Sequence, residues 1–354
     1  MKTKIAGLIV VIAVIAISVG FTVFTRSNQT LVLTGYAGGE KVGFLEDGEV
    51  QDILQKDYHL TIGYSKAGSL DMVRADKEGR DYLWPSSQTA LELYKSEVGK
   101  PVRSETIFNT PIVIYTRKPV AKALINEKIA KQKDGVYTVD LAKLMDLVVK
   151  GRSWSSLGLP QLYGNVTVYS TDPTKSNSGN MFAGLLANTL AGGVADESNI
   201  GPHLGEIKKI FQKSGYMDSS SADIFSEFLK MGMGSRPLVV GYENQLLEFS
   251  AENPDTWKQV KDDIVMMYPV PTVWSSHVWI AMDDKASEAI DALEDDKIQR
   301  LAWEKHGFRT GVAGSKEDSS AFPGVGIEEN VTQVGQLPNY KTMKMIMDAL
   351  DSDS

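Results

Sequence analysis

The chain has 354 residues, of which 42% are hydrophobic and 23% are charged, and it contains no cysteine. This composition is typical of a folded globular protein rather than of a disordered one. The lack of cysteine excludes a disulfide scaffold, thiolate metal sites, a cysteine nucleophile and a lipid anchor attached to cysteine. The formal net charge of −8 argues against a broad nucleic-acid-binding face.

Charge is distributed unevenly along the chain. Of the 37 basic residues, three lie in residues 1–26, which contain no acid, so the remainder has 34 basic against 45 acidic residues and a net charge of −11. The acidic part is therefore the part that we expect to fold outside a membrane.

Residues 5–24 form an uncharged apolar run of twenty residues. As a helix, the run would span about 30 Å, the thickness of a hydrocarbon core. Lys2 and Lys4 precede it, which predicts a cytoplasmic N-terminus and a C-terminal domain on the periplasmic or outer surface of the membrane. The run exceeds the 7–15 apolar residues of an ordinary signal peptide, which favours a single-pass anchor. The alternative is that the run is a signal peptide, which is cleaved so that the protein is secreted.

The first part of the exported chain alternates strands with helices. Apolar runs rich in β-branched residues predict strands, and helical periodicity after glycine or serine turns predicts helices. The predicted strands are 31–34, 60–64, 82–85 and 106–116, and the predicted helices are 44–54 and 88–98.

The rest of the chain repeats this alternation. A helix is predicted through residue 150 with Thr138 as its N-cap. The further predicted strands are 166–169, 237–240, 263–271 and 278–282, and the further predicted helices are 180–190, 222–231, 284–294, 297–306 and 340–350. Strand, turn and helix in repetition predict an α/β fold with a parallel sheet.

Three polar loops directly follow predicted strands, at residues 35–39, 65–69 and 170–180. Ligands of open α/β sheets bind outside the carboxyl ends of the strands. The third loop opens a helix with small polar residues from Ser176 to Gly179, and Lys175 adds a positive charge. Free N–H groups and the helix dipole would suit an oxyanion or carboxylate there. An ordinary helix N-cap preceded by a turn is the alternative.

Weaker candidates lie elsewhere in the chain. Asn109 and Thr110 interrupt a long β run, as an edge bend or as a hinge. Tyr242 follows a predicted strand and could contact a ligand, whereas Glu243 could accept a hydrogen bond or simply favour a helix start. Tyr36 could contact a ligand or cover the core.

Enzyme signatures are absent from the sequence. It contains no nucleophile elbow, no Ser-x-x-Lys pair, no phosphate-binding loop and no dinucleotide fingerprint. The four histidines have no metal-ligand spacing and are expected to be solitary structural residues. We therefore expect no catalysis, no cofactor and no metal.

The order of these features resembles that of type II periplasmic substrate-binding proteins, the solute receptors of ABC importers, with the phosphate- and molybdate-binding branches nearest. The resemblance covers roughly residues 30–310. It differs at Asn180, where those receptors have threonine, and at the N-terminus, where a membrane run replaces the usual export signal and lipid anchor. The matching segments are 31–39, 67–69, 84–87, 107–115, 176–179, 239–243 and 265–271.

The resemblance implies two α/β lobes joined by two crossing strands, with a solute in the cleft and closure by hinge bending. Residues 1–26 would form the membrane segment. Residues 30–110 plus 265–354 would form lobe one, and residues 111–264 would form lobe two.

The expected function is capture of a small anionic solute for an ABC permease or another membrane partner. A membrane-anchored sensory or stress-response module without transport is the alternative, and an enzyme on the same fold is a third. No nucleic acid is expected as a partner. The predicted ligand-binding residues are Gly35, Tyr36, Ser65, Gly68, Ser69, Ser86, Ser87, Asn109, Thr110, Ser176, Asn177, Ser178, Gly179, Tyr242 and Glu243.

Overall fold

The computed structural model describes residues 30–215, 217–312 and 317–351. Within these ranges, ten strands form one continuous mixed sheet. The expected membrane segment, residues 5–24, lies outside the described residues, and no helix among the described residues is long and apolar enough to cross a bilayer. The strands are β1 (Leu31–Ala37), β2 (Leu60–Lys66), β3 (Tyr82–Trp84), β4 (Arg103–Arg117), β5 (Ala130–Lys133), β6 (Val136–Asp140), β7 (Leu238–Tyr242), β8 (Ile264–Val270), β9 (Trp274–Ala281) and β10 (Arg309–Thr310).

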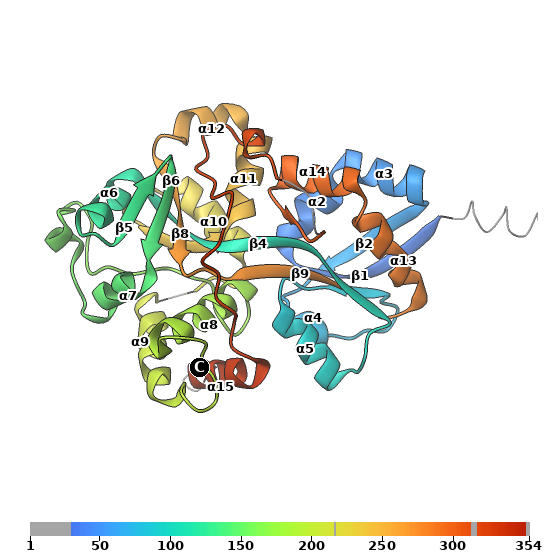
Figure 1. The fold of residues 1–354 in the computed structure, drawn as a ribbon, viewed down its shortest axis with the longest axis horizontal. Coiled ribbons are helices and arrows are strands. Elements are labelled where there is room, and N and C mark those ends of the chain that lie inside the picture. Colours follow the sequence, from blue (N-terminus) through green and yellow to red (C-terminus); the bar gives the residue numbers. More distant parts are fainter. Residues whose placement is uncertain (1–29, 216, 313–316, 352–354) are drawn as a thin grey trace, which may run out of the picture.

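Helices pack around this sheet at both ends of the molecule (Figure 1). Short 3-10 turns stand at Gly39–Lys41 (η1), Trp154–Leu157 (η2), Gly201–His203 (η3) and Ser319–Ala321 (η4). The α-helices are α2 (Val42–Glu46), α3 (Gly48–Tyr58), α4 (Asp71–Arg74), α5 (Gln88–Glu97), α6 (Lys118–Asn126), α7 (Leu141–Val149), α8 (Asn177–Ala191), α9 (Leu204–Lys213), α10 (Ser221–Lys230), α11 (Glu243–Glu252), α12 (Pro254–Val260), α13 (Asp284–Leu293), α14 (Asp296–His306) and α15 (Tyr340–Asp351).

The long strand β4 divides the molecule into two halves. Its first part, from Arg103 to Pro111, pairs antiparallel with β9, and its second part, from Ile112, pairs with β7 and β8. We call β1–β3, β9, β10, α2–α5, α13 and α14 the first half, and β5–β8, α6–α12 and α15 the second half. Figure 1 shows β4 and β9 crossing between them. Asn109 and Thr110 thus lie in an unbroken strand, at the point where it passes from one half to the other.

Only part of the sheet is parallel, contrary to the expectation of a parallel sheet. Strand β1 pairs parallel with β2 and β3, and β6 pairs parallel with β8, as strand–helix–strand units require. Strands β9, β7 and β8 instead pair antiparallel with β4. The pair of β4 and β9 is antiparallel because β9 returns along β4 from the second half to the first.

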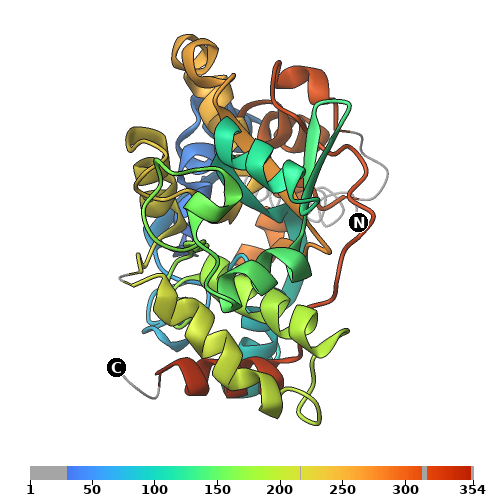
Figure 2. The ribbon, with the colours of Figure 1, turned by 90° about the vertical axis from the view of Figure 1, so that its left-hand side faces the viewer.

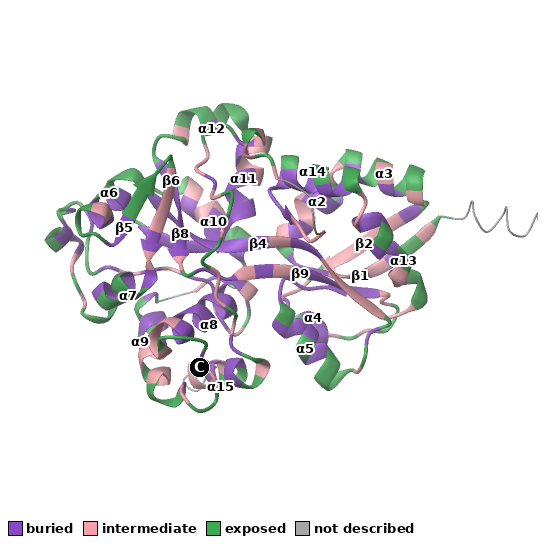
Figure 3. Cartoon of the chain, in the orientation of Figure 1, coloured by how far each residue is buried: buried purple, intermediate pink, exposed green. Residues whose placement is uncertain are grey.

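Each half has its own hydrophobic core. In the first half, Phe44, Trp84 and Phe108 pack together with their ring centroids 4.9–6.1 Å apart. In the second half, the largest cluster surrounds β4, α7 and α8. Figure 3 shows β4 as buried where it lies in the second half, and its last eight residues are all buried. Two cores on one shared strand give a two-lobed α/β architecture, as expected.

The C-terminal helix packs with the second half. Met343 and Ile346 of α15 are buried in the same cluster as Phe182 of α8 and Phe211 of α9. Figure 2 shows α15, in red, beside α9 at the lower end of the molecule. This packing differs from the division of the chain that the sequence predicts, in which residues 265–354 belong to lobe one. The lobe boundaries stay a prediction.

Two local predictions are wrong. Thr138 does not cap a helix but lies within β6, and the N-cap of α7 is Asp140, whose carboxylate accepts from the N–H of Lys143 at 3.1 Å. Residues 166–169 form no strand and make only an isolated bridge between Tyr169 and Val239.

Candidate functional site

A cavity of about 530 Å³ lies between the two halves. The loops that follow β1 and β2 form its first-half wall, and the starts of α8 and α10 with the end of β7 form its second-half wall. This is the edge at which open α/β sheets bind ligands. The lining residues are Gly38, Gly39, Glu40, Lys66, Ala67, Gly68, Ser69, Asp71, Lys175, Ser176, Asn177, Ser219, Ser220, Ser221, Ala222, Asp223 and Tyr242.

A buried ion pair forms the base of the first-half wall. The Nζ atom of Lys41 is 2.6 Å from Oε1 of Glu40, and it donates to Oγ of Ser86 at 2.8 Å. The same Nζ atom is 3.1 Å from Nδ1 of His277, and Ser86 also donates to Glu40. The side chains of Lys41 and His277 are fully buried, whereas that of Glu40 is 8% exposed and reaches the cavity.

The protonation states of this group follow from burial and mutual charge. Burial alone would raise the pKa of Glu40, but the charges of Lys41 and His277 and the hydrogen bonds from Lys41 and Ser86 lower it to about 2. Burial and the neighbouring Lys41 charge hold the pKa of His277 well below its usual range. Burial also lowers the pKa of Lys41, against the charge of Glu40. At neutral pH Glu40 is therefore a carboxylate and the imidazole of His277 is neutral.

Asn177 connects the two halves at the cavity. Its amide Nδ2 donates to the backbone oxygen of Ser86 in the first half at 2.8 Å and to the hydroxyl of Tyr242 in the second half at 3.0 Å. Burial and the charge of Glu40 raise the pKa of Tyr242, so its hydroxyl stays protonated at neutral pH. A single amide on the first residue of α8 thus joins both walls.

The backbones of the two walls also approach closely at Gly68. A Cβ atom added to Gly68 would lie 2.7 Å from the backbone oxygen of Lys175. Any larger residue at this position would push the two halves apart. Ser69, the next residue, accepts with its hydroxyl from the N–H of Ser86 at 2.9 Å and so ties the loop after β2 to the loop after β3.

Two helices of the second half begin at the cavity without a side-chain cap. The N-cap residues are Ser176 for α8 and Ser220 for α10, and neither side chain accepts a hydrogen bond from its helix. The first N–H groups of a helix have no intrahelical partners and carry the positive end of its dipole. Two such ends facing one cavity favour a negatively charged group there.

Ser178 and Gly179 support this helix start from behind. The hydroxyls of Thr171 and Ser178 are 2.7 Å apart, and the N–H of Gly179 donates to Thr171 Oγ1 at 2.8 Å. A Cβ atom on Gly179 would lie 2.2 Å from the backbone oxygen of Thr171. These two predicted site residues are buried and position α8, and they do not line the cavity.

Three predicted residues of β1 and β2 lie outside the cavity. Gly35 makes room for Tyr82, because a Cβ atom there would lie 2.3 Å from the backbone oxygen of Tyr82. The hydroxyl of Tyr36 donates to the backbone oxygen of Asp76 at 3.1 Å, and Ser65 pairs with Tyr36 between the two strands. The sequence places these loops correctly but the cavity begins further along each of them.

Three further predicted residues do not line the cavity. Ser87 is the buried N-cap residue of α5, and its hydroxyl has no hydrogen-bond partner among the described residues. Asn109 accepts from the hydroxyl of Ser276 at 2.9 Å, and Thr110 accepts from the N–H of Asn244 at 3.2 Å, which holds the start of α11. None of the three lines the cavity between the halves.

Glu243 is held in a second buried ion pair. Arg309 donates to both of its carboxylate oxygens, with Nε at 2.7 Å and Nη2 at 2.8 Å, and the hydroxyl of Tyr268 also donates to it. Burial opposes the charge of Arg309, yet the charge of Glu243 raises the Arg309 pKa above its usual range. The carboxylate is fully buried and its acceptor positions face Arg309 and Tyr268 rather than a ligand.

The sequence misses part of the second-half wall and the whole ion pair. Residues 219–223 line the cavity from the start of α10, and three consecutive serines before a predicted helix were a signal that could have found them. Glu40 and Lys41 follow the predicted glycine loop directly. His277 carries no local signal, because only the antiparallel return of β9 brings it to Lys41.

Another cavity, of about 400 Å³, lies within the second half and under the C-terminal segment. Its walls come from residues 128–143, 268–272 and 328–333, so the first half contributes nothing to it. Among the described residues, neither cavity brings together three histidine, aspartate or glutamate side chains at metal-binding distances. The cavity between the halves is therefore the better candidate for a binding site whose closure moves one half against the other.

Comparison with solved structures supports the fold. The apo ferric ion-binding protein A of Pasteurella haemolytica aligns with a TM-score of 0.60 at 13% identity, over 91% of this chain and 97% of that one. The periplasmic binding protein AfuA from Actinobacillus pleuropneumoniae, with fructose-6-phosphate bound, aligns with a TM-score of 0.59 at 12% identity, over 89% and 96%. A two-component system protein that mediates signal transduction aligns with a TM-score of 0.52 at 14% identity, over 89% and 99%.

No family model matches the chain, and no curated protein matches it significantly in sequence. The named neighbours are binding proteins and a signalling protein, not enzymes. A specific likeness to phosphate- or molybdate-binding proteins stays a prediction. At these identities the likeness concerns the fold: the chain has the two-lobed α/β fold of periplasmic binding proteins of type II.

Proposed function

We propose that the chain is an extracytoplasmic solute-binding protein that holds a small anionic solute in the cavity between its halves. The observation that carries the proposal is the pair of uncapped helix starts, those of α8 and α10, at one cavity. Lys66 adds positive charge at the rim, where Lys175 is paired with Asp172 at 3.0 Å. The serine hydroxyls and helix N–H groups would replace the water shell of an oxyanion.

The acidic residues of the cavity limit the charge that such a solute carries. Glu40 neutralises Lys41, and Asp71 and Asp223 lie on opposite walls. A singly or doubly charged group seated at the helix starts fits this balance better than a polyanion does. Surface charge elsewhere is screened within about 8–10 Å at physiological salt, so the cavity decides the preference.

The test is a thermal-shift screen of the full-length chain in detergent. Phosphate, sulfate, molybdate, tungstate, tellurite and small carboxylates form the panel. A ligand at 100 times its dissociation constant stabilises the fold by about 2.7 kcal/mol, which raises the melting temperature by several degrees. If no panel member moves the melting curve, the proposal of an anionic solute is wrong.

The variant Asn177→Asp tests whether the anion binds in the cavity between the halves. The variant keeps the size of the side chain but loses both donated hydrogen bonds and places a negative charge at the start of α8. We expect the response to the anion found in the screen to weaken at least tenfold. Asn165→Asp, an exposed change far from the cavity, is the matched control and should respond as the wild type does.

Delivery of the solute to an ABC permease is the first candidate for the downstream step. The likeness to a signal-transduction protein favours a membrane-anchored sensory module as the second. Uptake of the labelled solute by cells with and without the gene separates them. Loss of uptake supports delivery to an importer, whereas unchanged uptake with an altered transcriptional response to the solute supports the sensory role.

A further inference from the structure

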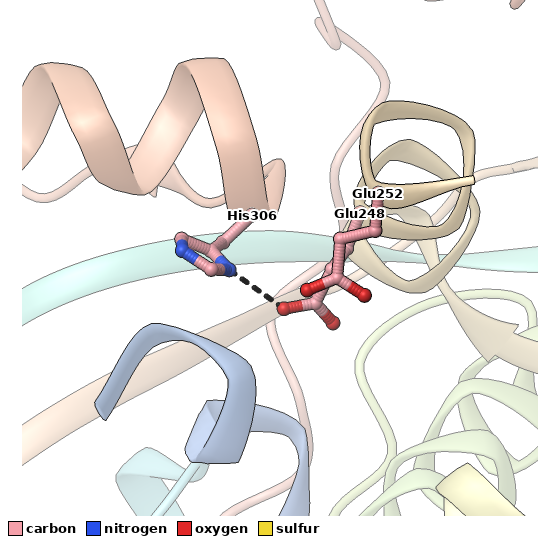
Figure 4. A group of neighbouring side chains, drawn as sticks. All are labelled: Glu248, Glu252 and His306. Carbon is pink, nitrogen blue, oxygen red and sulfur yellow. Dashed lines mark hydrogen bonds and ion pairs between the residues drawn. The ribbon is translucent and has the colours of Figure 1, made fainter. Parts of the chain in front are cut away.

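Three side chains outside the cavity join α11 of the second half to α14 of the first (Figure 4). Glu248 and Glu252 lie one turn apart on α11, and His306 is the last residue of α14. Nδ1 of His306 is 2.7 Å from Oε1 of Glu248. One possible ligand atom from each of the three residues lies within 4.8 Å of the others. The chain thus places one imidazole nitrogen and two carboxylates around one point.

The imidazole of His306 has the orientation of a metal ligand. The side chain is 2% exposed, and its Nε2 atom lies 3.5 Å from Oδ2 of Asp47, on the side away from the glutamates. In the metal-free chain Nδ1 is in hydrogen-bond contact with Glu248, and Nε2 makes no hydrogen bond among the described residues. A metal at this point would replace the proton on Nδ1, and the Asp47 carboxylate would then favour the proton on Nε2. In this arrangement Nδ1 faces Glu248 and Glu252, and Asp47 lies beside the opposite nitrogen.

The charged side chains around Glu248, Glu252 and His306 favour a cation between these three residues. Glu248, Glu252 and Asp47 are opposed by Lys305, which pairs with Asp47 at 3.0 Å and not with either glutamate. Among the described residues, no ion pair or hydrogen bond of the Glu252 carboxylate is found.

Gly43 on α2 leaves the space that this cluster occupies. A Cβ atom at Gly43 would lie 2.2 Å from Oε1 of Glu248 and 3.4 Å from Nδ1 of His306. Any side chain there would separate the glutamate from the imidazole.

We propose that Glu248, Glu252 and His306 bind one divalent first-row transition-metal ion between α11 and α14. A mixed set of imidazole nitrogen and carboxylate oxygens suits Zn²⁺ and its neighbours, whereas Mg²⁺ and Ca²⁺ prefer oxygen ligands alone. Three protein ligands leave a fourth position for water. The ion would tie the two halves together at a point separate from the solute cavity. The sequence expects solitary histidines, and His306 departs from this because its partners lie 54 and 58 positions earlier in the chain.

Calorimetric titration of the metal-free, full-length chain with ZnCl₂ tests the proposal. We expect one ion per chain and at least tenfold weaker binding of Mg²⁺. Glu252→Gln should weaken Zn²⁺ binding at least tenfold, and since Glu252 is exposed the change leaves the packing intact. Glu304→Gln on α14, whose carboxylate pairs with Arg300, is the matched control and should bind as the wild type does.

Asp47→Asn tests the support of the ring. Asparagine can still cap α3, so the fold is kept, but the carboxylate behind His306 is gone. We expect a loss of about 10- to 100-fold in Zn²⁺ affinity. Nitrogen superhyperfine structure in the spectrum of bound Cu²⁺ would show the imidazole ligand. Absence of Zn²⁺ binding to the wild type, or equal affinity in Glu252→Gln, would overturn the proposal.

Discussion

The molecule contains two buried glutamate–cation pairs that differ in what remains for a ligand. In one, Glu243 and Arg309 meet through two charge-assisted hydrogen bonds, and Tyr268 also donates to the carboxylate. In the other, Glu40 and Lys41 meet at a cavity wall and share Ser86 with Asn177 of the opposite half. Both pairs are buried, but only the second has a carboxylate that reaches open space.

This difference separates a structural role from a binding role better than burial does. Arg309 also donates to the backbone oxygens of Glu328 and Glu329, so it fastens the C-terminal segment to the sheet. Around Lys41, by contrast, Nε2 of His277 is buried without a hydrogen-bond partner among the described residues. The Arg309 pair thus holds elements together, whereas the carboxylate of Glu40 lines the cavity and stays within reach of a ligand.

Arg309→Met should have the largest effect. It leaves Glu243 buried without its cation, and breaking one partner of a buried pair costs about 3–5 kcal/mol. Urea unfolding measures the loss. The double variant Glu243→Gln/Arg309→Met removes both charges and should recover part of the stability. A loss below about 1 kcal/mol in the single variant would contradict a structural role for the pair.

Acid should weaken the cavity pair next. The pKa of Glu40 falls from an ordinary 4.5 to about 2 in the folded chain, so its contribution is full above about pH 4.5 and is lost as the pH falls toward 2. Since one pKa unit corresponds to about 1.4 kcal/mol, the contribution is about 3 kcal/mol. Unfolding curves between pH 6 and pH 2 should show a flatter profile for Glu40→Gln than for the wild type.

The control for this acid profile is Glu78→Gln. Glu78 is exposed, so its substitution should leave the wild-type slope unchanged. An equal loss on acidification in Glu40→Gln and the wild type would mean that the cavity pair contributes nothing to stability.

Tyr242→Phe should have the smallest effect. It removes the hydroxyl that accepts from Asn177 across the cavity, which costs about 1 kcal/mol of stability and a few-fold in affinity for the solute. Tyr36→Phe removes a hydroxyl outside the cavity and should leave the solute affinity unchanged. Thermal-shift titrations with the anion from the screen compare the two. Equal affinities in both variants would remove Tyr242 from the proposed site.

Much of the fold could be predicted from the sequence, because hydrophobic periodicity and turn residues are local. Strands β1, β2, β3 and β8 and helices α5, α13 and α14 lie within a few residues of their predicted positions. Asp47 shows what hydrophobic periodicity alone cannot predict. It interrupts the predicted helix 44–54 by capping α3 with two backbone hydrogen bonds, and a periodic pattern contains no trace of that break.

The candidate site could be predicted only where it follows strand ends. Gly68, Ser69, Ser176, Asn177 and Tyr242 line the cavity, and their contact with a ligand stays a prediction. The remaining groups depend on long-range pairing, since His277 reaches Lys41 across 236 positions of sequence. No local sequence pattern predicts a contact between residues so far apart in the chain.

The C-terminal segment adds a third passage between the halves, besides β4 and residues 271–273. Residues 317–339 leave the first half near Trp303, run beside Thr272 and end in α15 against α8 and α9 (Figure 1). Two adjacent crossing strands alone would act as an axle about which the halves can swing. The segment pairs with Thr272 beside that axle, and α15 at its end contacts α5 of the first half as well as α8 and α9. A wide opening of the halves would therefore have to separate α15 from α5.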